Sequence, residues 1–216
     1  MAAYVGSAII LRDKILALGI KNGIAIGILV FFAIVVTKIG ESIGRSLVER
    51  SKFIRKLILG KDYIEGSWVD LSIDHQNKLL RAVALVEIEY QNGSIAFGGQ
   101  VFGCNGVPVG NFDSSVAGYK NNTLWYVYNR EVVFENKEKA TGRGELKFTR
   151  ESHNPTSYYG SFFDTETELE ISVEGARIQD KKTLKMLRKQ EGKAQVVKEY
   201  SERFVNNHPA YRISEA

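Results

Sequence analysis

The sequence is poor in cysteine, proline and histidine. Its 216 residues include one cysteine, Cys104, three prolines and three histidines. A single cysteine cannot form an intramolecular disulfide or a multi-cysteine metal site, which fits a reducing cytosol. The histidines, at positions 75, 153 and 208, show no metal-ligand spacing. The chain also lacks a nucleophile elbow, a Walker loop and a zinc pattern, so we expect no enzyme, no cofactor and no metal site.

Aromatic residues and glycine are plentiful instead. Ten tyrosines and eleven phenylalanines bring the aromatic share to 11%, and twenty glycines stand against the three prolines. This composition favours a folded, turn-rich β protein over a disordered chain. The length allows one domain of ordinary size with appendages. A formal net charge of +4 permits attraction to anionic lipid or nucleotide but does not require it.

The most apolar stretch, Asn22–Thr37, carries no charge. Its apolar run, Ile24–Val36, is shorter than the roughly 20 residues that a membrane-crossing helix needs. Counted from Ala17 to Thr37, the segment reaches that length with only Lys21 inside it, near an end where the ammonium group can reach the interface. We therefore predict a transmembrane helix within a membrane region of residues 1–40.

Two other interpretations of this segment are weaker. A signal peptide is disfavoured because the run begins late and no cleavage pattern follows Val36. A buried core helix is disfavoured because the segment is apolar on every side and a β-rich chain offers little to bury it. The preceding Ala2–Ile20 is either the first arm of a membrane hairpin or, more in keeping with its central Arg12, Asp13 and Lys14, an amphipathic helix at the interface.

Lysine and arginine are concentrated after the apolar run. By the positive-inside rule, this concentration places the C-terminal part of the chain in the cytoplasm. Between Lys38 and Leu59, apolar residues recur at spacings of about three and four with cations between them. Residues 41–61 are therefore predicted to form a basic juxtamembrane helix, with Gly60 as its stop. Such a helix suits contact with anionic headgroups or with copies of itself.

From Asp62 onward the sequence pattern changes to a period of two. Residues typical of strands alternate in several segments, and Asn92-Gly93 is a strong hairpin signal. The segments are 84–90, 94–103, 123–129, 144–149, 156–164 and 165–174. Short strands without intervening helices predict an antiparallel sandwich or an up-and-down barrel of about eight strands in residues 62–178. The remainder, residues 179–216, has helical spacing and predicts a basic helical tail.

The segment Gly66-Ser67-Trp68 stands at the head of the first predicted strand and resembles the Gly-x-Trp signature of the calycins, the lipocalin and fatty-acid-binding barrels. In that superfamily the tryptophan closes one end of the barrel and packs against an arginine that follows the last strand. Arg177 stands at the corresponding place in this chain. The resemblance therefore implies that Trp68 and Arg177 are structural residues that close the barrel, with the guanidinium stacked on the indole.

The interior of a barrel of about eight strands is either filled by side chains or able to hold one small ligand, and both alternatives stay open. Glycines at positions 98, 99 and 160 would leave room inside. Aromatic walls would stack on a ligand, and cations would meet its phosphates. The candidate ligand-binding residues, which combine aromatic, amide and cationic side chains, are Tyr90, Gln100, Tyr126, Tyr128, Arg143, Lys147, Arg150, Tyr158 and Phe162.

The chain also resembles the CBASS anti-phage membrane effectors called CD-NTase-associated protein fifteen. The resemblance rests on the membrane segment, on Gly66-Ser67-Trp68, and on the segments Leu124–Tyr128 (LWYVY), Gly142–Phe148 (GRGELKF) and Tyr158–Asp164 (YYGSFFD). This chain differs from that family in two respects. The family is described with two membrane helices, and the basic tail after Arg177 is long in this chain.

The resemblance implies a protein of the bacterial inner membrane, with its barrel on the cytoplasmic side. It implies a cyclic dinucleotide as ligand, made by a partner nucleotidyltransferase after phage infection, and no nucleic acid polymer as partner. Binding would drive homo-oligomerisation, and contact with membrane lipid would lead to membrane disruption and death of the infected cell.

We therefore expect a mainly β protein with an N-terminal transmembrane helix, an antiparallel calycin-like barrel of about eight strands and a C-terminal helical tail. Two other functions stay open. One is a membrane-anchored, lipocalin-like carrier of lipid or another hydrophobic ligand, and the other is a ligand-free, self-associating scaffold. An apolar cavity lining would favour the carrier, a lining with arginine and lysine would favour a phosphorylated ligand, and a filled barrel would favour the scaffold.

Overall fold

The computed structural model of the chain describes residues 22–91, 93–132, 139–150, 155–166 and 168–214. The chain divides into two compact units, with the boundary between Ile54 and Arg55. The segment Ala2–Ile20 lies outside the described residues, so the alternatives for it stay predictions. The side chain of Arg150 also lies outside the described part.

The first unit contains one long helix, α2 (Asn22–Arg50), followed by the start of α3 (Lys52–Leu59). The sequence boundary between the membrane region and the juxtamembrane helix falls inside α2, which continues without a break. Gly60, at a φ of +52°, follows the last residue of α3 and begins the short 3-10 helix η1 (Gly60–Asp62). Among the described residues, none of the helices combines the length and the apolar character needed to cross a bilayer.

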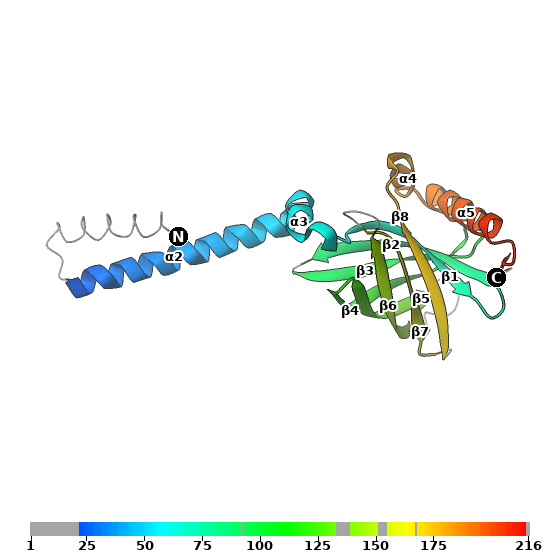
Figure 1. Cartoon of the computed structure of the whole chain (residues 1–216), viewed down its shortest axis with the longest axis horizontal. Helices are drawn as coiled ribbons and strands as arrows, with labels where there is room; N and C mark the ends of the chain where they lie inside the picture. Colours follow the sequence, from blue (N-terminus) through cyan, green and yellow to red (C-terminus); the bar gives the residue numbers. More distant parts are fainter. Residues whose placement is uncertain (1–21, 92, 133–138, 151–154, 167, 215–216) are drawn as a thin grey trace. The chain divides into compact units, whose positions relative to one another are not determined.

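The second unit is built on eight antiparallel strands that close into a barrel (Figure 1). Each strand pairs with the next along the chain, and pairing of the first strand with the last closes the ring. The strands are β1 (Gly66–Asp74), β2 (Leu79–Gln91), β3 (Ser94–Phe102), β4 (Pro108–Lys120), β5 (Thr123–Val132), β6 (Lys139–Arg150), β7 (Pro155–Asp164) and β8 (Leu169–Arg177). The prediction of an antiparallel barrel of about eight strands is confirmed.

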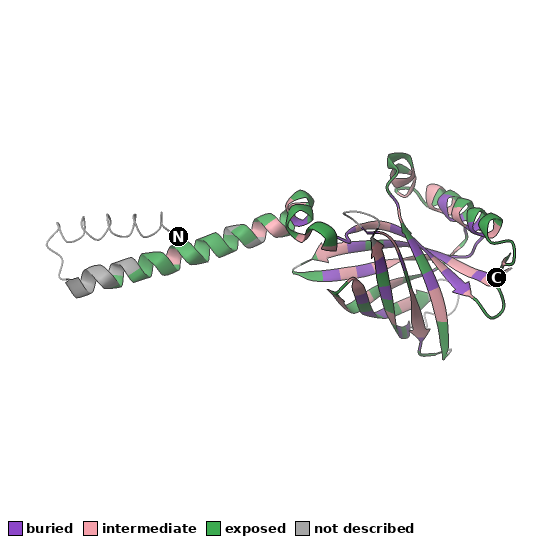
Figure 2. Ribbon diagram, viewed as in Figure 1, coloured by how far each residue is buried: buried purple, intermediate pink, exposed green. Residues whose placement is uncertain are grey.

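Side chains alternate between the barrel interior and its outer face, as the period of two predicts. Figure 2 shows buried and exposed residues succeeding each other along the strands. The interior cluster contains Trp68, Val86, Phe97, Leu124 and Leu146 among its buried residues. Between β2 and β3 and between β3 and β4, the glycines at 93 and 106 have φ values of +79° and +81°, a conformation that favours glycine.

A second cluster of buried residues lies outside the barrel, beneath the C-terminal helices α4 (Lys181–Met186) and α5 (Gln190–Asn207). Helix α5 lies beside β2 and β1 and buries its apolar stripe against their outward-facing side chains (Figure 1). The stripe comprises Val196, Val197 and Phe204, and it packs with residues such as Val69, Leu85 and Phe102. A short strand, β9 (Arg212–Ile213), then pairs in parallel with the start of β2. The predicted C-terminal helix is therefore present and forms part of the barrel unit.

Candidate functional site

One end of the barrel is closed by a large indole. Trp68 is fully buried, and its ring centroid lies 5.3 Å from those of both Phe148 and Tyr158. Its Nε1 donates a hydrogen bond of 3.1 Å to the carbonyl of Ile64. The guanidinium carbon of Arg177 lies 5.3 Å from the centroid of the same ring. These contacts pack the indole tightly among its neighbours at this end.

Arg177 also explains the glycine that precedes Trp68. The guanidinium donates to the main-chain carbonyls of Tyr63, Glu65 and Pro155, which brings three segments together beneath it. Gly66 has a φ of +141°, and a Cβ there would lie 3.3 Å from the Arg177 Nη2. A side chain at this position would therefore be strained by the backbone and would crowd the guanidinium.

A cavity of about 150 Å³ lies within the barrel toward the opposite end. Strands on all sides of the barrel contribute to it, because each directs alternate side chains inward. Aromatic rings form much of its wall, and these belong to Phe112, Tyr126, Tyr128 and Phe162. Three charged side chains, Asp70, Arg81 and Arg130, also line it.

Three polar atoms of this lining have no hydrogen-bond partner within the described part of the chain. They are Oδ1 of Asp70, the hydroxyl of Tyr128 and Nε of Arg130. Asp70 is only 6% exposed, and its other oxygen accepts a hydrogen bond of 3.1 Å from the hydroxyl of Tyr158. Most buried polar atoms in proteins are paired, so three unpaired atoms around one cavity mark it as a place where a ligand or ordered water binds.

Burial changes the acid–base properties of two of these groups. It raises the pKa of Asp70 to about 7, and the hydrogen bond from Tyr158 only partly opposes this shift. Burial likewise raises the pKa of Tyr128 to about 12, so its hydroxyl stays protonated near neutral pH and can both donate and accept. Perturbed carboxyl groups in cavities are frequent at functional sites, which supports the assignment of this cavity.

The two arginines stand at the mouth of the cavity. Their side chains are 38% and 33% exposed for Arg81 and Arg130, whereas Asp70 lies deep inside. Nε of Arg81 donates to Oδ2 of Asp74 over 3.0 Å, and Nη2 of Arg130 lies 3.3 Å from Oδ2 of Asp164. Each cation is therefore held in place by a carboxylate, and Nε of Arg130 still has no partner among the described residues.

Tyrosine rings fill much of the remaining interior, and glycines on neighbouring strands make room for them. A Cβ at Gly144 would lie 2.4 Å from the ring of Tyr126, and a Cβ at Gly175 would lie 2.0 Å from the ring of Tyr158. The glycines at 98, 99 and 160, in contrast, approach neighbouring strands, because a Cβ at each would meet main-chain atoms at 2.9 Å or less. They serve strand packing and do not enlarge the cavity.

Four of the aromatic candidates lie inside the barrel. Tyr126, Tyr128 and Phe162 line the cavity, and Tyr158 connects Asp70 with the ring of Trp68. Tyr90 packs against the interior cluster, and its main-chain N–H donates to Oε1 of Glu65 over 3.1 Å.

The polar candidates lie elsewhere. Arg143 and Lys147 are exposed on β6, at positions that alternate with the buried Gly142 and Leu146. Gln100 accepts a hydrogen bond of 3.1 Å from Lys193 of α5, outside the barrel. The structure therefore does not bring Arg143, Lys147 or Gln100 to the cavity.

Sequence reasoning missed Asp70 and Arg130. Each lies two residues beyond a residue that had been singled out, Trp68 and Tyr128 respectively, and so shares its inward face. The period of two was the signal that could have found them.

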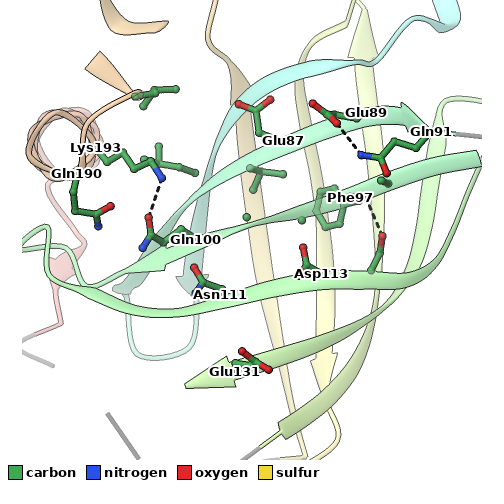
Figure 3. A pocket seen from close by; sticks show the side chains of 17 residues that line it. Glu87, Glu89, Gln91, Phe97, Gln100, Asn111, Asp113, Glu131, Gln190 and Lys193 are labelled. Atoms are coloured by element: carbon green, nitrogen blue, oxygen red, sulfur yellow. Dashed lines mark hydrogen bonds between the residues drawn. The ribbon is translucent and has the colours of Figure 1, made fainter. Parts of the chain in front are cut away.

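A larger hollow, of about 750 Å³, lies on the outer face of the barrel beside the start of α5 (Figure 3). Four carboxylates line it, those of Glu87, Glu89, Asp113 and Glu131. Lys193 is the cation that lines it, and Figure 3 shows its ammonium directed at Gln100. Within the described residues this groove contains no buried unpaired polar atom, and its carboxylates would repel an anionic ligand.

The interior cavity is thus the stronger candidate site. It can surround a planar group with aromatic rings, offer a hydrogen-bond acceptor at depth and offer donors at the mouth. In comparisons with family models, curated proteins and solved structures, nothing matches this chain, so its function is argued from the cavity itself.

Proposed function

We propose that the barrel is the receptor part of a membrane-attached effector and that its ligand is a cyclic dinucleotide. The observation that supports this proposal is the interior cavity, where aromatic rings surround three polar atoms without partners. Aromatic side chains stack on nucleobases of any kind, and guanidinium groups form strong hydrogen bonds with phosphates. The cavity offers both types of group.

The size of the cavity limits how such a ligand would bind. Pockets for drug-sized ligands usually measure about 300–1,000 Å³, whereas this one measures about 150 Å³. One base would therefore enter the cavity, and the sugar–phosphate ring would stay at the mouth. Arg81 and Arg130 reach solvent there, where their guanidinium groups would meet a phosphate.

The polar atoms also favour this ligand over a lipid. An acyl chain in the cavity would leave Asp70, Tyr128 and Arg130 unpaired, and each buried unpaired group costs about 1–3 kcal/mol. The two arginines favour a phosphorylated ligand over the lipid carrier. The tyrosine-filled interior is what favours a ligand-free scaffold, but a scaffold gives no role to the three unpaired atoms.

In this proposal a partner nucleotidyltransferase supplies the ligand after phage infection. Binding must favour an assembled state over the resting one, because a ligand shifts an equilibrium only by its difference in affinity for the two states. Copies of the chain would then cluster in the bacterial inner membrane and disrupt it, and the infected cell would die.

Titration of the full chain, purified in detergent, with a panel of cyclic dinucleotides tests the receptor assignment. We expect at least one of them to bind, with heat measurable by calorimetry. Replacing Arg130 by glutamine should lower the affinity for that ligand by about tenfold or more, because a charge-assisted hydrogen bond contributes about 1.5–3 kcal/mol. Arg143→Gln on the outer face is the matched control and should leave the affinity unchanged. Absence of binding to every member would refute the proposal, and equal losses in both variants would place the site elsewhere.

The membrane part of the proposal rests on α2. Several of its large apolar side chains are about half exposed or more, among them Phe31 at 65% and Phe32 at 55%. Apolar surface of this kind is removed from water by lipid at about 25 cal/mol per Å². We expect the full chain to sediment with membranes and the double variant Phe31→Glu, Phe32→Glu to move largely to the soluble fraction, with ligand affinity retained. Glu41→Lys, on the polar part of α2, is the control, and unchanged sedimentation of the double variant would contradict the role of α2.

A further inference from the structure

The polar atoms of the cavity also indicate which base enters it, an inference that rests on the proposed function. We propose that the base is of the amino-keto type, guanine or cytosine, and that Asp70, Tyr128 and Arg130 hold its hydrogen-bonding edge.

The three unpaired atoms differ in what they can do. Oδ1 of an ionised Asp70 only accepts hydrogen bonds, Nε of Arg130 only donates, and the hydroxyl of Tyr128 does both. All three atoms are buried, and Asp70 and Tyr128 are also buried as whole residues, at 6% and 5% exposed. The side chain of Arg130 is 33% exposed and extends from its buried Nε to the mouth. The cavity therefore presents an acceptor inside, a donor at the mouth and an adaptable hydroxyl.

Tyr128 lies on the same side as Arg130. The two residues occupy alternate positions of β5, and Nη2 of Arg130 lies 3.3 Å from Oδ2 of Asp164 at the end of β7. Asp70 instead lies on β1, where its Oδ2 accepts a hydrogen bond from Tyr158, whose ring packs against Trp68. The acceptor and the obligate donor thus stand at opposite ends of the set.

A complementary ligand edge needs an N–H donor at one end, an acceptor at the other and a third group between them. Guanine offers N2–H₂, N1–H and O6, and cytosine offers N4–H₂, N3 and O2. Because the middle hydroxyl adapts to either N1–H or N3, both bases satisfy all three cavity atoms. Adenine offers only two groups on this edge, and uracil carries carbonyl oxygens at both ends.

The other two bases would leave the cavity incompletely paired. Adenine leaves one buried polar atom without a partner, which should lower its affinity by about tenfold or more. Uracil places a carbonyl oxygen against the Asp70 carboxylate, and two acceptors in contact repel each other. Sites built to pair a polar edge reject ligands that lack the matching group.

The test compares four cyclic dinucleotides, each carrying one type of base, on the full chain in detergent. The titrations are run at about pH 8, where Asp70 is mostly ionised. We expect the guanine or the cytosine compound to bind about tenfold or more tightly than both the adenine and the uracil compounds. The comparison of guanine with cytosine identifies which of the two enters.

Two variants assign the preference to named atoms. Asp70→Asn replaces part of the acceptor by an N–H₂ donor, and Tyr128→Phe removes one hydroxyl with little change in shape. Each should bring the four affinities closer together, whereas Tyr159→Phe on the outer face should leave the preference intact. If Asp70→Asn does not fold, the four affinities measured for Tyr128→Phe test the assignment by themselves.

The outcomes separate the two proposals. Tightest binding of the adenine or the uracil compound would overturn the base assignment while leaving the receptor assignment in place. A preference for guanine or cytosine that survives in Tyr128→Phe and Asp70→Asn would overturn the role of these residues. Absence of binding to all four compounds would overturn both proposals.

Discussion

Replacing Asp70 by asparagine is expected to raise the free energy of unfolding at about pH 8 and to leave it nearly unchanged at about pH 3. Burial raises the pKa of this carboxyl from 3.8 to about 7 in the folded protein. Below the lower value both states hold the proton, so the folded state has no disadvantage. Between the two values only the folded state holds it, and stability falls as pH rises. Above about 7 the full cost of the buried charge is present.

The size of this effect follows from the two pKa values. A difference from 3.8 to about 7 corresponds to a ceiling on the order of 4 kcal/mol. Asparagine keeps the shape of the side chain but cannot ionise, so it removes that cost at alkaline pH. Denaturant unfolding of the wild-type and variant chains at the two pH values measures the difference. Asp113→Asn, at an exposed position, should change stability little at either pH.

A wild-type chain that is the more stable of the two at alkaline pH would show that Asp70 is paired in solution. The expected result has a functional meaning as well. A buried carboxyl with one unpaired oxygen lowers the stability of the free protein, and a ligand that supplies the missing partner would recover part of that loss.

The largest loss of stability is expected from Glu65→Ala. The carboxylate of Glu65 forms a two-pronged ion pair with Arg55, with distances of 2.7 Å from Nε to Oε2 and 2.9 Å from Nη2 to Oε1. The side chains of Arg55 and Glu65 are only 5% and 2% exposed. Removing one member of a buried pair leaves the other charge without compensation and typically costs about 3–5 kcal/mol.

Two further variants give this prediction a sharp control. Glu170→Ala removes an exposed carboxylate that accepts a hydrogen bond from Ser161, and should change stability by less than about 0.5 kcal/mol. Arg55→Met combined with Glu65→Leu replaces both charges by apolar groups and should recover most of the loss. Denaturant unfolding measures all three. A Glu65→Ala chain as stable as Glu170→Ala would show that the pair is solvated.

The sequence predicted the barrel because its pattern is local, but it left one strand out. The alternation in segments such as 84–90 and the Asn92-Gly93 turn identify strands before any partner is known. Strand β4, in contrast, contains Asn111, Asp113, Ser114 and Ser115, which are poor or indifferent strand formers. It is a strand because β3 and β5 pair with it on both sides, and an irregularity between Ser114 and Val116 interrupts its alternation.

The site was predictable only in part, because the sequence did not fix which strand residues face inward. Tyr126 and Tyr128 were found from their aromatic character. Arg143 was expected to face a ligand, but a strand residue faces in or out according to whether its position is odd or even relative to its neighbours. Gly142 and Gly144 take the inward positions of β6, which places Arg143 outside.

Charge alone was also a poor guide to exposure. Arg55 appeared in the sequence as one cation among many in a basic helix, whereas the fold buries it against Glu65. Its partner, Glu65, lies ten residues further along the chain, and nothing in the sequence around Glu65 indicates that the two side chains pair.

The order of the strands bears on how the barrel forms over time. Seven of the eight pairings within the barrel join neighbours in sequence, so each can form as a hairpin with a short loop. The eighth joins β1 to β8, and in it Trp68 stands opposite Arg177, on the order of a hundred residues away. Because that long loop must close before its contacts are gained, ring closure is the slow event of an otherwise local assembly. The indole and the guanidinium meet at this last pairing, so burial of Trp68 reports the moment at which the sheet becomes a barrel.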